Sequence, residues 1–376
     1  MTPWLDSIRV ERLHVPLVKP YRLAFGPVTG YDTLLVELID REGRRGWGEA
    51  TLLTGYTDET IDGAWTLASA LAPQLLRCTR EQFAARCVTE GQGAPFTATA
   101  FMTASEMLTG SAHLKLRQSA HTGNMAGRSK VPILGLLNAT ERSAVRDEAT
   151  ALLARGYRTF KVKVGFDVDD DIRNVSTIQS EVAGRAAIRL DANQGYSAAD
   201  ACRFLAALDP AGIELFEQPC TAGDWASHAA AVRVARVPMM LDESIYGLAD
   251  IERAARERQA DYVKVKLMKF VSLAALSESI ALIRARGMKP VLGNGVANDL
   301  GCWMEACVAA DSIDNAGEMN GFLKPVGQFF AEPLGFADGH IELPDTQPVI
   351  DEAALQRFRV AACHARQPAM HRFFLN

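Results

Sequence analysis

The sequence predicts an α/β protein whose larger part is a parallel (β/α)8 barrel. From Val131 onward, short β-like runs alternate with helical runs rich in Ala, Leu and Arg, at a repeat of about 25 residues, which is typical of such a barrel. No GxGxxG or P-loop motif follows an early run, so a doubly wound sheet that binds a nucleotide has no support. The eight β-like runs are Val131–Leu137, Thr159–Gly165, Ala187–Asn193, Ile213–Pro219, Val237–Ser244, Tyr262–Leu267, Pro290–Asn294 and Ser312–Glu318.

The residues on either side of the barrel predict a smaller domain. Residues 7–50 alternate apolar and polar side chains, which predicts an antiparallel sheet with a turn near Asp40–Gly43. We expect the stretch Lys19–Pro27 between the strands to be a loop. Residues 58–124 are rich in Ala, Leu, Gln and Glu and predict helices. The tail from about Gln347 is polar and helical in composition, and we expect it to lie against the N-terminal domain.

The composition excludes several classes of protein. The chain has 376 residues and a formal net charge of -5 without a basic run, so no nucleic-acid-binding surface is expected. Its 48% hydrophobic content suits a globular protein large enough for a barrel and an added domain. The seven cysteines form no CxxC pair, which indicates reduced thiols. A charged N-terminus and the lack of a bilayer-length apolar run lead us to expect a cytoplasmic protein without membrane contact.

Polar residues gather near the C-terminal ends of the predicted strands, where barrel enzymes place their active sites. Side chains alternate along a strand, so the two lysines of Lys161-Val162-Lys163 share a face, and so do those of Lys264-Val265-Lys266. The strands between these two end in Asp191-Ala192-Asn193, Glu217-Gln218-Pro219 and Asp242-Glu243-Ser244.

The three acids at these strand ends predict a metal site. Asp191, Glu217 and Asp242 come from adjacent strands and would converge, and three carboxylates in a low-dielectric site repel one another. A hard divalent cation removes that repulsion, and oxygen ligands without His or Cys favour Mg²⁺ or Mn²⁺ over zinc.

The lysines on strands two and six would face each other across that site. A substrate at the centre would have one lysine on each side, an arrangement suited to removing the proton α to a carboxylate, with the cation stabilising the enediolate. A lysine acts as a base only if its pKa falls towards neutrality, as burial, a second lysine and a cation all favour. Lys264 could equally be a strand residue paired with an acid, and we expect Glu243 to point away from Asp242. All seven histidines lie off the strand ends, and no GxSxG elbow occurs.

The order Lys-x-Lys, Asp-x-Asn, Glu-Gln-Pro, Asp-Glu-Ser, Lys resembles the enolase superfamily, and specifically its muconate lactonizing enzyme subgroup within the mandelate racemase/muconate lactonizing enzyme family. The resemblance covers nearly the whole chain. Its further motifs are Gly46–Thr51, Gly55–Thr57, Thr159–Gly165 and Asp261–Lys269.

The resemblance implies a modified TIM barrel, (β/α)7β, at residues 129–345, under an α+β capping domain at residues 1–128 that the segment 346–376 completes. It also implies Mg²⁺ held by Asp191, Glu217 and Asp242, a small-molecule carboxylate as substrate, and a homo-oligomer, either a dimer or an octamer. Lys163 and Lys266 would be the acid/base pair. Lys161 would neutralise the substrate carboxylate, Asn193 would support the metal shell, and Glu318 is similar to the glutamate that ends strand eight.

In such families the capping loops and strands seven and eight select the substrate. The corresponding segments are Tyr21–Tyr31, Thr51–Thr57, Asn294–Asp299 and Glu318–Lys324. The individual candidates are Tyr21, Phe25, Tyr31, Thr54, Tyr56, Asn294, Asn298 and Met319.

The chain departs from the family pattern in three places. Phe270-Val271-Ser272 replaces the Gly-Gly after the strand-six motif, and Asp314-Asn315-Ala316 replaces the Asp-x-Asp of dipeptide epimerases. The usual Trp-Asp or Tyr-Asp near residues 105–113 is also missing. Epimerisation of dipeptides therefore ranks below the other reactions.

The predicted function is that of a muconate cycloisomerase or a racemase/epimerase. The alternative is a dehydratase that performs β-elimination on a hydroxy or sugar acid. A Schiff-base lyase that uses Lys163 or Lys266 as the nucleophile ranks lower, because it needs no triple carboxylate set. A non-catalytic binding protein ranks lower because the metal ligands and both lysines are intact.

Overall fold

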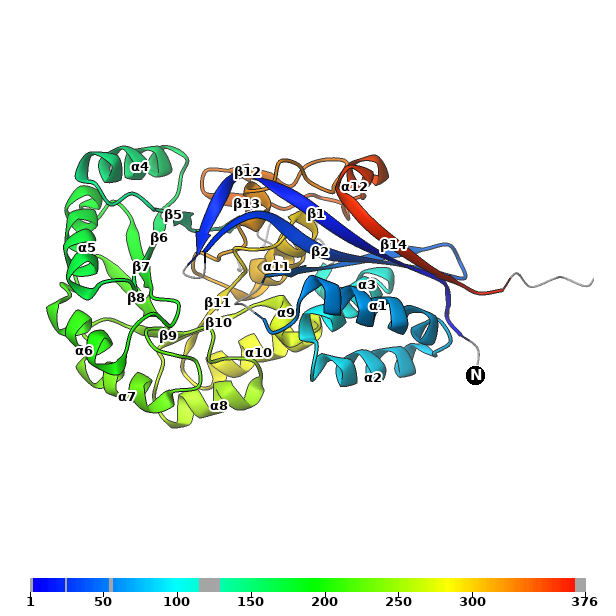
Figure 1. The fold of residues 1–376 in the computed structure, drawn as a ribbon, viewed down its shortest axis with the longest axis horizontal. Coiled ribbons are helices and arrows are strands. Elements are labelled where there is room, and N and C mark those ends of the chain that lie inside the picture. Colours follow the sequence, from blue (N-terminus) through cyan, green and yellow to red (C-terminus); the bar gives the residue numbers. More distant parts are fainter. Residues whose placement is uncertain (1–2, 24–25, 54–56, 115–128, 369–376) are drawn as a thin grey trace, which may run out of the picture.

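The structure, a computed structural model, describes residues 3–23, 26–53, 57–114 and 129–368. It contains an antiparallel N-terminal sheet and a parallel sheet of seven strands (Figure 1). Within the described residues, no helix is both long and apolar enough to span a bilayer.

The N-terminal sheet joins the two ends of the chain. Its strands are β1 (Leu5–Leu23), β2 (Gly26–Asp40), β3 (Arg45–Leu52) and β14 (Arg359–Arg366), in the order β14-β1-β2-β3. β14 pairs antiparallel with β1, so the C-terminal segment lies against the N-terminal domain (Figure 1). The exact domain boundaries stay a prediction.

The predicted turn at Asp40–Gly43 is confirmed, whereas the predicted loop is wrong. Asp40 Oδ1 accepts hydrogen bonds at 2.9 Å from the backbone N of Glu42 and of Arg44. β1 instead continues to Leu23 and β2 begins at Gly26, with a register shift after Pro16. Cross-strand pairing beyond this irregularity outweighs the weak strand preference of a proline-containing stretch.

Three helices cover one face of this sheet, as predicted for the described part of residues 58–124. They are α1 (Ile61–Leu75), α2 (Arg80–Gly91) and α3 (Pro95–Leu108), followed by the short 3-10 helix η1 (Ala112–Leu114). Thr60 and Thr79 cap α1 and α2 through their side chains. α3 lies so close to β3 that a Cβ atom on Gly48 would clash with the backbone O of Ala100.

The second sheet forms the barrel wall, with its strands in sequence order and parallel. The strands are β5 (Gly135–Leu136), β6 (Thr159–Lys163), β7 (Ala187–Asp191), β8 (Ile213–Glu217), β9 (Met239–Leu241), β10 (Tyr262–Val265) and β11 (Lys289–Leu292). The helices are α4 (Arg142–Ala154), α5 (Val168–Val182), α6 (Ala198–Ala207), α7 (Trp225–Val234), α8 (Leu248–Arg256), the short α9 (Leu267–Phe270), α10 (Leu273–Ala285) and α11 (Asp299–Ser312). In Figure 1 the helices α4 to α8 form an outer arc around these strands.

The prediction of an eighth strand at Ser312–Glu318 is wrong, because this segment does not form an extended strand. Ser312 ends α11, and the segment contributes one isolated bridge between Gly317 and Ile133. Backbone hydrogen bonds of 2.9 Å still join it to both edges of the wall, from Leu134 N to Gly317 O and from Glu318 N to Leu292 O. The segment therefore closes the barrel with few bonds.

The first predicted strand, Val131–Leu137, is divided into two pieces. Its start is β4 (Lys130–Pro132), which pairs with β13 (His340–Glu342) in a small sheet that also contains β12 (Gly335–Ala337). Only β5 belongs to the barrel. A 3-10 turn, η2 (Gly321–Leu323), and a short helix, α12 (Glu352–Phe358), lie in the C-terminal part.

Glu49 in β3 connects the N-terminal domain to the barrel through hydrogen bonds. Its Oε1 accepts a hydrogen bond of 2.6 Å from the backbone N of Asn298, and its Oε2 accepts one of 3.0 Å from Gly301 N. These donors belong to the N-terminus of α11, where the helix dipole favours a negative charge. Burial raises the pKa of Glu49. This contact holds the N-terminal sheet over the C-terminal ends of the barrel strands.

Candidate active site

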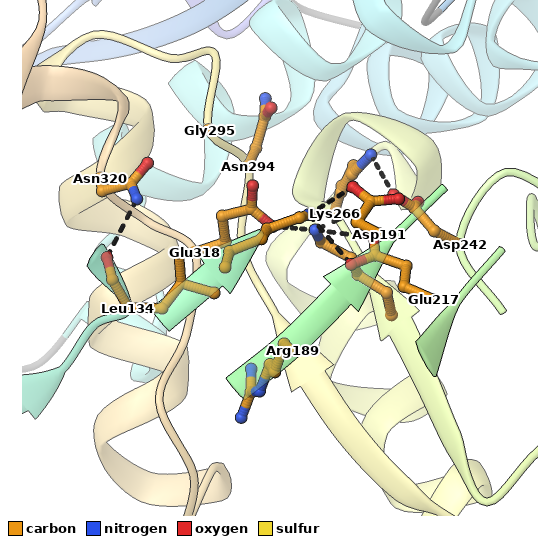
Figure 2. Close-up of polar contacts among 12 residues, drawn as sticks. Leu134, Arg189, Asp191, Glu217, Asp242, Lys266, Asn294, Gly295, Glu318 and Asn320 are labelled. Carbon is orange, nitrogen blue, oxygen red and sulfur yellow. Dashed lines mark hydrogen bonds and ion pairs between the residues drawn. The ribbon is translucent and has the colours of Figure 1, made fainter. Parts of the chain in front are cut away.

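The structure brings the predicted strand-end side chains into one buried cluster (Figure 2). Asp191 and Glu217 end β7 and β8, and Asp242 follows β9. Figure 2 shows these three carboxylates beside Lys266 and Glu318. All five side chains are buried.

Lys161 lies at the centre of the cluster. Its Nζ atom is 2.8 Å from Asp191 Oδ2, 2.9 Å from Glu217 Oε2 and 2.8 Å from Glu318 Oε2. Lys264 Nζ lies 3.1 Å from Glu217 Oε1 and also contacts Glu318. Lys264 is therefore paired with neighbouring acids, as one of the two expectations for it had it. These acids, Glu217 and Glu318, belong to the cluster itself.

Lys163 and Lys266 lie at the two ends of the row of acids. Lys163 Nζ is 2.6 Å from Asp191 Oδ2, and Lys266 Nζ is 2.8 Å from Asp242 Oδ2. Asn193 accepts a hydrogen bond from Lys163 through Oδ1 and donates one of 2.9 Å from Nδ2 to Glu243 Oε1. Glu243 thus reaches the edge of the same network through Asn193.

Burial and charge act in opposite directions on the acids. Burial raises the pKa of Asp191, but the charges of Lys161 and Lys163 outweigh it and lower that pKa to about 2. Burial and the charge of Asp191 raise the pKa of Glu217 to about 7. The lysines around Asp242 and Glu318 lower both of their pKa values against the effect of burial.

Without a bound cation, the pKa of Lys266 does not fall towards neutrality, as the sequence led us to expect, but is raised. Burial alone lowers its pKa, but the charge of Asp242 outweighs burial and raises it. The ammonium group of Lys266 contacts the Asp242 carboxylate, a proximity that strand periodicity alone does not indicate.

Lys269 is a member of the cluster that the sequence reasoning did not assign to the site. Its Nζ atom donates hydrogen bonds to Asp242, of 2.6 Å to the backbone O and 3.0 Å to Oδ1. It also lies 4.6 Å from the centre of the Tyr246 ring, a cation-π contact. The signal was the i, i+3 spacing from Lys266, which places both lysines on one side of α9.

Gln218 positions Asp242 through the backbone. Its Oε1 accepts hydrogen bonds from Asp242 N at 2.9 Å and Ser244 N at 3.2 Å, and its Nε2 donates to Cys220 O at 3.0 Å. The Glu-Gln-Pro motif thus supplies both an acid and the group that orients the next acid.

Several predicted specificity residues have structural partners. Asn294 Nδ2 donates to Val296 O at 2.9 Å, and Asn298 Nδ2 donates to Thr33 Oγ1 at 2.9 Å. Tyr31 donates from its hydroxyl to Gly295 O at 3.1 Å, and Met319 is buried. The side chain of Tyr21, and the whole of Phe25, Thr54 and Tyr56, lie outside the described residues. A role of these residues in specificity stays a prediction.

A small cavity separates the N-terminal domain from the Lys266 side of the cluster. Its lining combines four apolar side chains with polar ones, among them Lys266 and Lys269. The other lining residues are Thr51, Leu53, Phe96, Met268, Asn294 and Val296.

The chemistry of the donor set fits a hard divalent cation. Asp191 and Glu217 meet at Lys161, while Glu217 Oε1 and Asp242 Oδ2 lie 3.1 and 3.9 Å from Lys264 Nζ, so the three acids are neighbours. Lysine ammonium groups stand between them. Across the described ranges, no three His, Cys, Asp or Glu side chains are close enough to hold an ion as they stand. The carboxylates would therefore exchange lysine contacts for a cation.

A wall of parallel strands, with carboxylates and lysines at their C-terminal ends under an α+β cap, defines the class of enolase-type barrels. The family described as "Enolase C-terminal domain-like" matches residues 144–348, and the chain belongs to this family. Within the enolase superfamily it groups with the muconate lactonizing enzymes and related racemases and epimerases, and it is an enzyme of their isomerase type.

Individual relatives span most of the chain. L-Ala-D/L-Glu epimerase of Bacillus subtilis (strain 168) is 28% identical over 330 residues, which cover 81% of this chain and 85% of the relative. Muconate cycloisomerase 1 of Rhodococcus opacus is 26% identical over 90% of this chain and 93% of its own. The crystal structure of muconate lactonizing enzyme from Pseudomonas fluorescens complexed with muconolactone superposes with a TM-score of 0.83, at 25% identity, and covers 96% of this chain and 100% of that one.

Proposed function

We propose that the protein is a Mg²⁺-dependent enzyme that removes the proton α to a substrate carboxylate, as a cycloisomerase or as a racemase/epimerase. The observation that carries the proposal is the placement of Lys163 and Lys266 at opposite ends of a row of three carboxylates. Relatives named as cycloisomerases, racemases and epimerases support the same type of reaction.

Each residue has a distinct role in the proposal. Asp191, Glu217 and Asp242 hold the divalent cation, which supplies electrostatic stabilisation of a negatively charged enediolate. Lys163 and Lys266 remove and return the α-proton at their Nζ atoms.

The residues around these two lysines orient them and exclude water. Asn193 holds Lys163 through its amide oxygen. Glu318 anchors Lys161, whose charge favours a carboxylate at the centre of the barrel. The N-terminal domain lies over the Lys266 side of the cluster, so solvent hydrogen reaches the α-carbon through the lysine ammonium groups and not by direct contact with bulk water.

The test is α-proton exchange in D₂O with Mg²⁺, measured by mass spectrometry on a panel of acid sugars, dienoates, hydroxy acids and N-substituted amino acids. We expect exchange with the wild-type protein and its loss in the double variant Lys163→Met/Lys266→Met. Lys289→Met is the matched control, because Lys289 is an exposed lysine at the opposite end of a neighbouring strand. Exchange that survives in the double variant contradicts the proposal. Activity in EDTA together with a borohydride-trapped adduct would favour a Schiff-base lyase instead.

A further inference from the structure

A strained residue joins the two helices that follow β10. Val271 lies between α9 and α10 and has a φ of 67° and a ψ of -31°. Across it, Ser272 N donates a hydrogen bond of 2.7 Å to Phe270 O, so the three residues form a tight turn with a left-handed conformation at its centre. This turn lies where the chain departs from the Gly-Gly of the family pattern.

Valine is poorly suited to this conformation. Glycine adopts a positive φ freely, whereas a β-branched side chain there is crowded against the backbone. Among the described residues, the other non-glycine residues with a positive φ are not β-branched. A turn strained in this way persists only where its surroundings hold it in place.

The N-terminal domain holds the far side of the turn. Glu106 in α3 accepts hydrogen bonds from Leu273 N at 2.8 Å and from Ala274 N at 3.1 Å. These are the first two backbone N–H groups of α10, where the helix dipole favours a carboxylate. Glu106 therefore fixes the position at which α10 begins, two residues after Val271.

The same domain also contacts the turn and the helix before it. Gly91 ends α2, and a Cβ atom there would lie only 2.8 Å from Val271 Cγ2. Thr99 in α3 donates a hydrogen bond of 3.3 Å from Oγ1 to Met268 O in α9. Both α2 and α3 therefore contact the segment that contains the turn.

A helix of only four residues connects the turn to Lys266. Lys266 immediately precedes α9, and Val271 immediately follows it. Lys269 N donates a hydrogen bond of 3.0 Å to Lys266 O, which joins the lysine to this single helical turn. A relaxation of Val271 to a negative φ would rotate α9 relative to α10 and would displace Lys266. Lys163 lies in β6 and is not part of this segment.

We propose that Glu106 is a positioning residue for Lys266: it holds the start of α10, keeps Val271 in its strained conformation and so fixes the lysine that precedes α9. This inference rests on the proposed function, in which Lys266 exchanges the α-proton. Hydrogen bonds from α10 to the N-terminal domain offset the strain in the turn. Exchange at Lys266 therefore depends on a residue of the N-terminal domain that acts through the backbone.

The test is α-proton exchange of each enantiomer of a substrate in D₂O with Mg²⁺, after Lys163→Met and Lys266→Met have identified the enantiomer that each lysine serves. Glu106→Gln keeps the size of the side chain and removes the charge that holds α10. Strain of this kind biases a turn by about one to two powers of ten. We therefore expect kcat to fall about 10-fold for the enantiomer that Lys266 serves, and to stay within about 2-fold for the other.

A residue that accepts a positive φ should compensate for the loss of Glu106. Val271→Gly removes the strain, so Glu106→Gln/Val271→Gly should recover most of the exchange that depends on Lys266. Glu106→Gln/Val271→Asn is a second rescue, because Asn also adopts the left-handed conformation but has less freedom than Gly. The inference is overturned, and the proposed function stays intact, if Glu106→Gln has no effect, if it affects both enantiomers equally, or if neither change at Val271 restores exchange.

Glu148→Gln is the matched control. Glu148, like Glu106, is a half-buried glutamate that accepts hydrogen bonds from two successive backbone N–H groups, Asn138 N at 2.9 Å and Ala139 N at 2.8 Å. These groups follow β5, at the opposite edge of the sheet from β10 and β11, so the two enantiomers should keep their wild-type ratio of kcat. A ratio that changes as in Glu106→Gln would indicate a general loss of stability and overturns the inference. Thermal melts check folding, and Glu106→Asp, which is one methylene shorter, takes the place of Glu106→Gln if that variant does not fold.

Hydrogen exchange of the backbone amides tests the hold on the turn without a substrate. If no acid exchanges its α-proton, the proposed function has failed, but mass spectrometry of peptic peptides still reports on residues 266–273. We expect Glu106→Gln to speed amide exchange in this segment by about 10-fold, and the added change at Val271 to reverse the effect. That result would support the hold of Glu106 on the turn. Unchanged amide exchange in this segment overturns it.

Discussion

Lys163 and Lys266 approach the same row of carboxylates from opposite ends, Lys163 at 2.6 Å from Asp191 Oδ2 and Lys266 at 2.8 Å from Asp242 Oδ2. Lys163 ends β6 and Lys266 follows β10, and these two strands are separated in the sheet by β7, β8 and β9. A planar enediolate between them would therefore present one face to each lysine.

This arrangement predicts that each lysine serves one face of the substrate. We expect Lys163→Met to abolish exchange for one configuration at the α-carbon and Lys266→Met for the other, each by about 10²- to 10⁴-fold, the usual contribution of a positioned acid or base. Exchange of each enantiomer in D₂O, followed by chiral chromatography, measures this. Equal loss for both enantiomers in both variants would contradict the assignment of opposite faces.

Addition and removal of the metal should change stability through the three acids. Mg²⁺ at about 100 times its Kd would stabilise the folded protein by about 2.7 kcal/mol, because it binds the folded state alone. We expect a saturable rise in Tm that EDTA reverses and that Asp242→Asn largely removes. Asp345→Asn, at an exposed acid outside the cluster, should retain the rise. An equal rise in both variants would show binding elsewhere.

Arg189 should prove necessary for the segment that closes the barrel. It is buried in β7 and donates to Ala316 O at 2.7 Å and to Glu214 Oε2 at 2.9 Å. Arg189→Met leaves these acceptors unpaired and should lower the free energy of unfolding by about 3 kcal/mol. Urea denaturation measures this, with Arg203→Met as a control because Arg203 pairs with Asp169 at the surface. Equal stability of the two variants would refute the role of Arg189.

Asp299 should make stability depend on pH. Burial raises its pKa in the folded state to about 7 from the ordinary value of 3.8, against hydrogen bonds from Phe329 N and Phe330 N. The folded protein then binds this proton more tightly than the unfolded chain does. The stability contribution is therefore fully present below pH 3.8 and is lost as the pH rises through about 7.

Asp299→Asn should flatten this dependence and make the variant the more stable protein at pH 8, by up to about 4 kcal/mol for a three-unit shift. Denaturation at pH 5, 6, 7 and 8 measures the effect, with Asp345→Asn as the exposed control. If the stability of the wild-type protein instead rises from pH 5 to 8 relative to that of Asp299→Asn, the pKa of Asp299 is not raised in the folded state, and the prediction is wrong.

The strand-end chemistry could be predicted because it depends on local order in the chain. The alternation within Lys161-Val162-Lys163 and the positions of Asp191, Glu217 and Asp242 after successive runs follow from strand periodicity alone. The strand at Ser312–Glu318 could not be excluded in this way, because its residues suit a strand. Whether they pair depends on where α11 ends and on the distance between β5 and β11.

The amino-acid sequence by itself determined the βα repeat, the family and the side chains that occupy the strand ends. Only the tertiary structure decided how those charges pair: Lys266 with Asp242, and Lys161 with three acids. The reason is physical. Periodicity fixes the side of a strand on which a residue lies, whereas the pKa and partner of a buried charge depend on distances of a few ångströms between segments far apart in the chain.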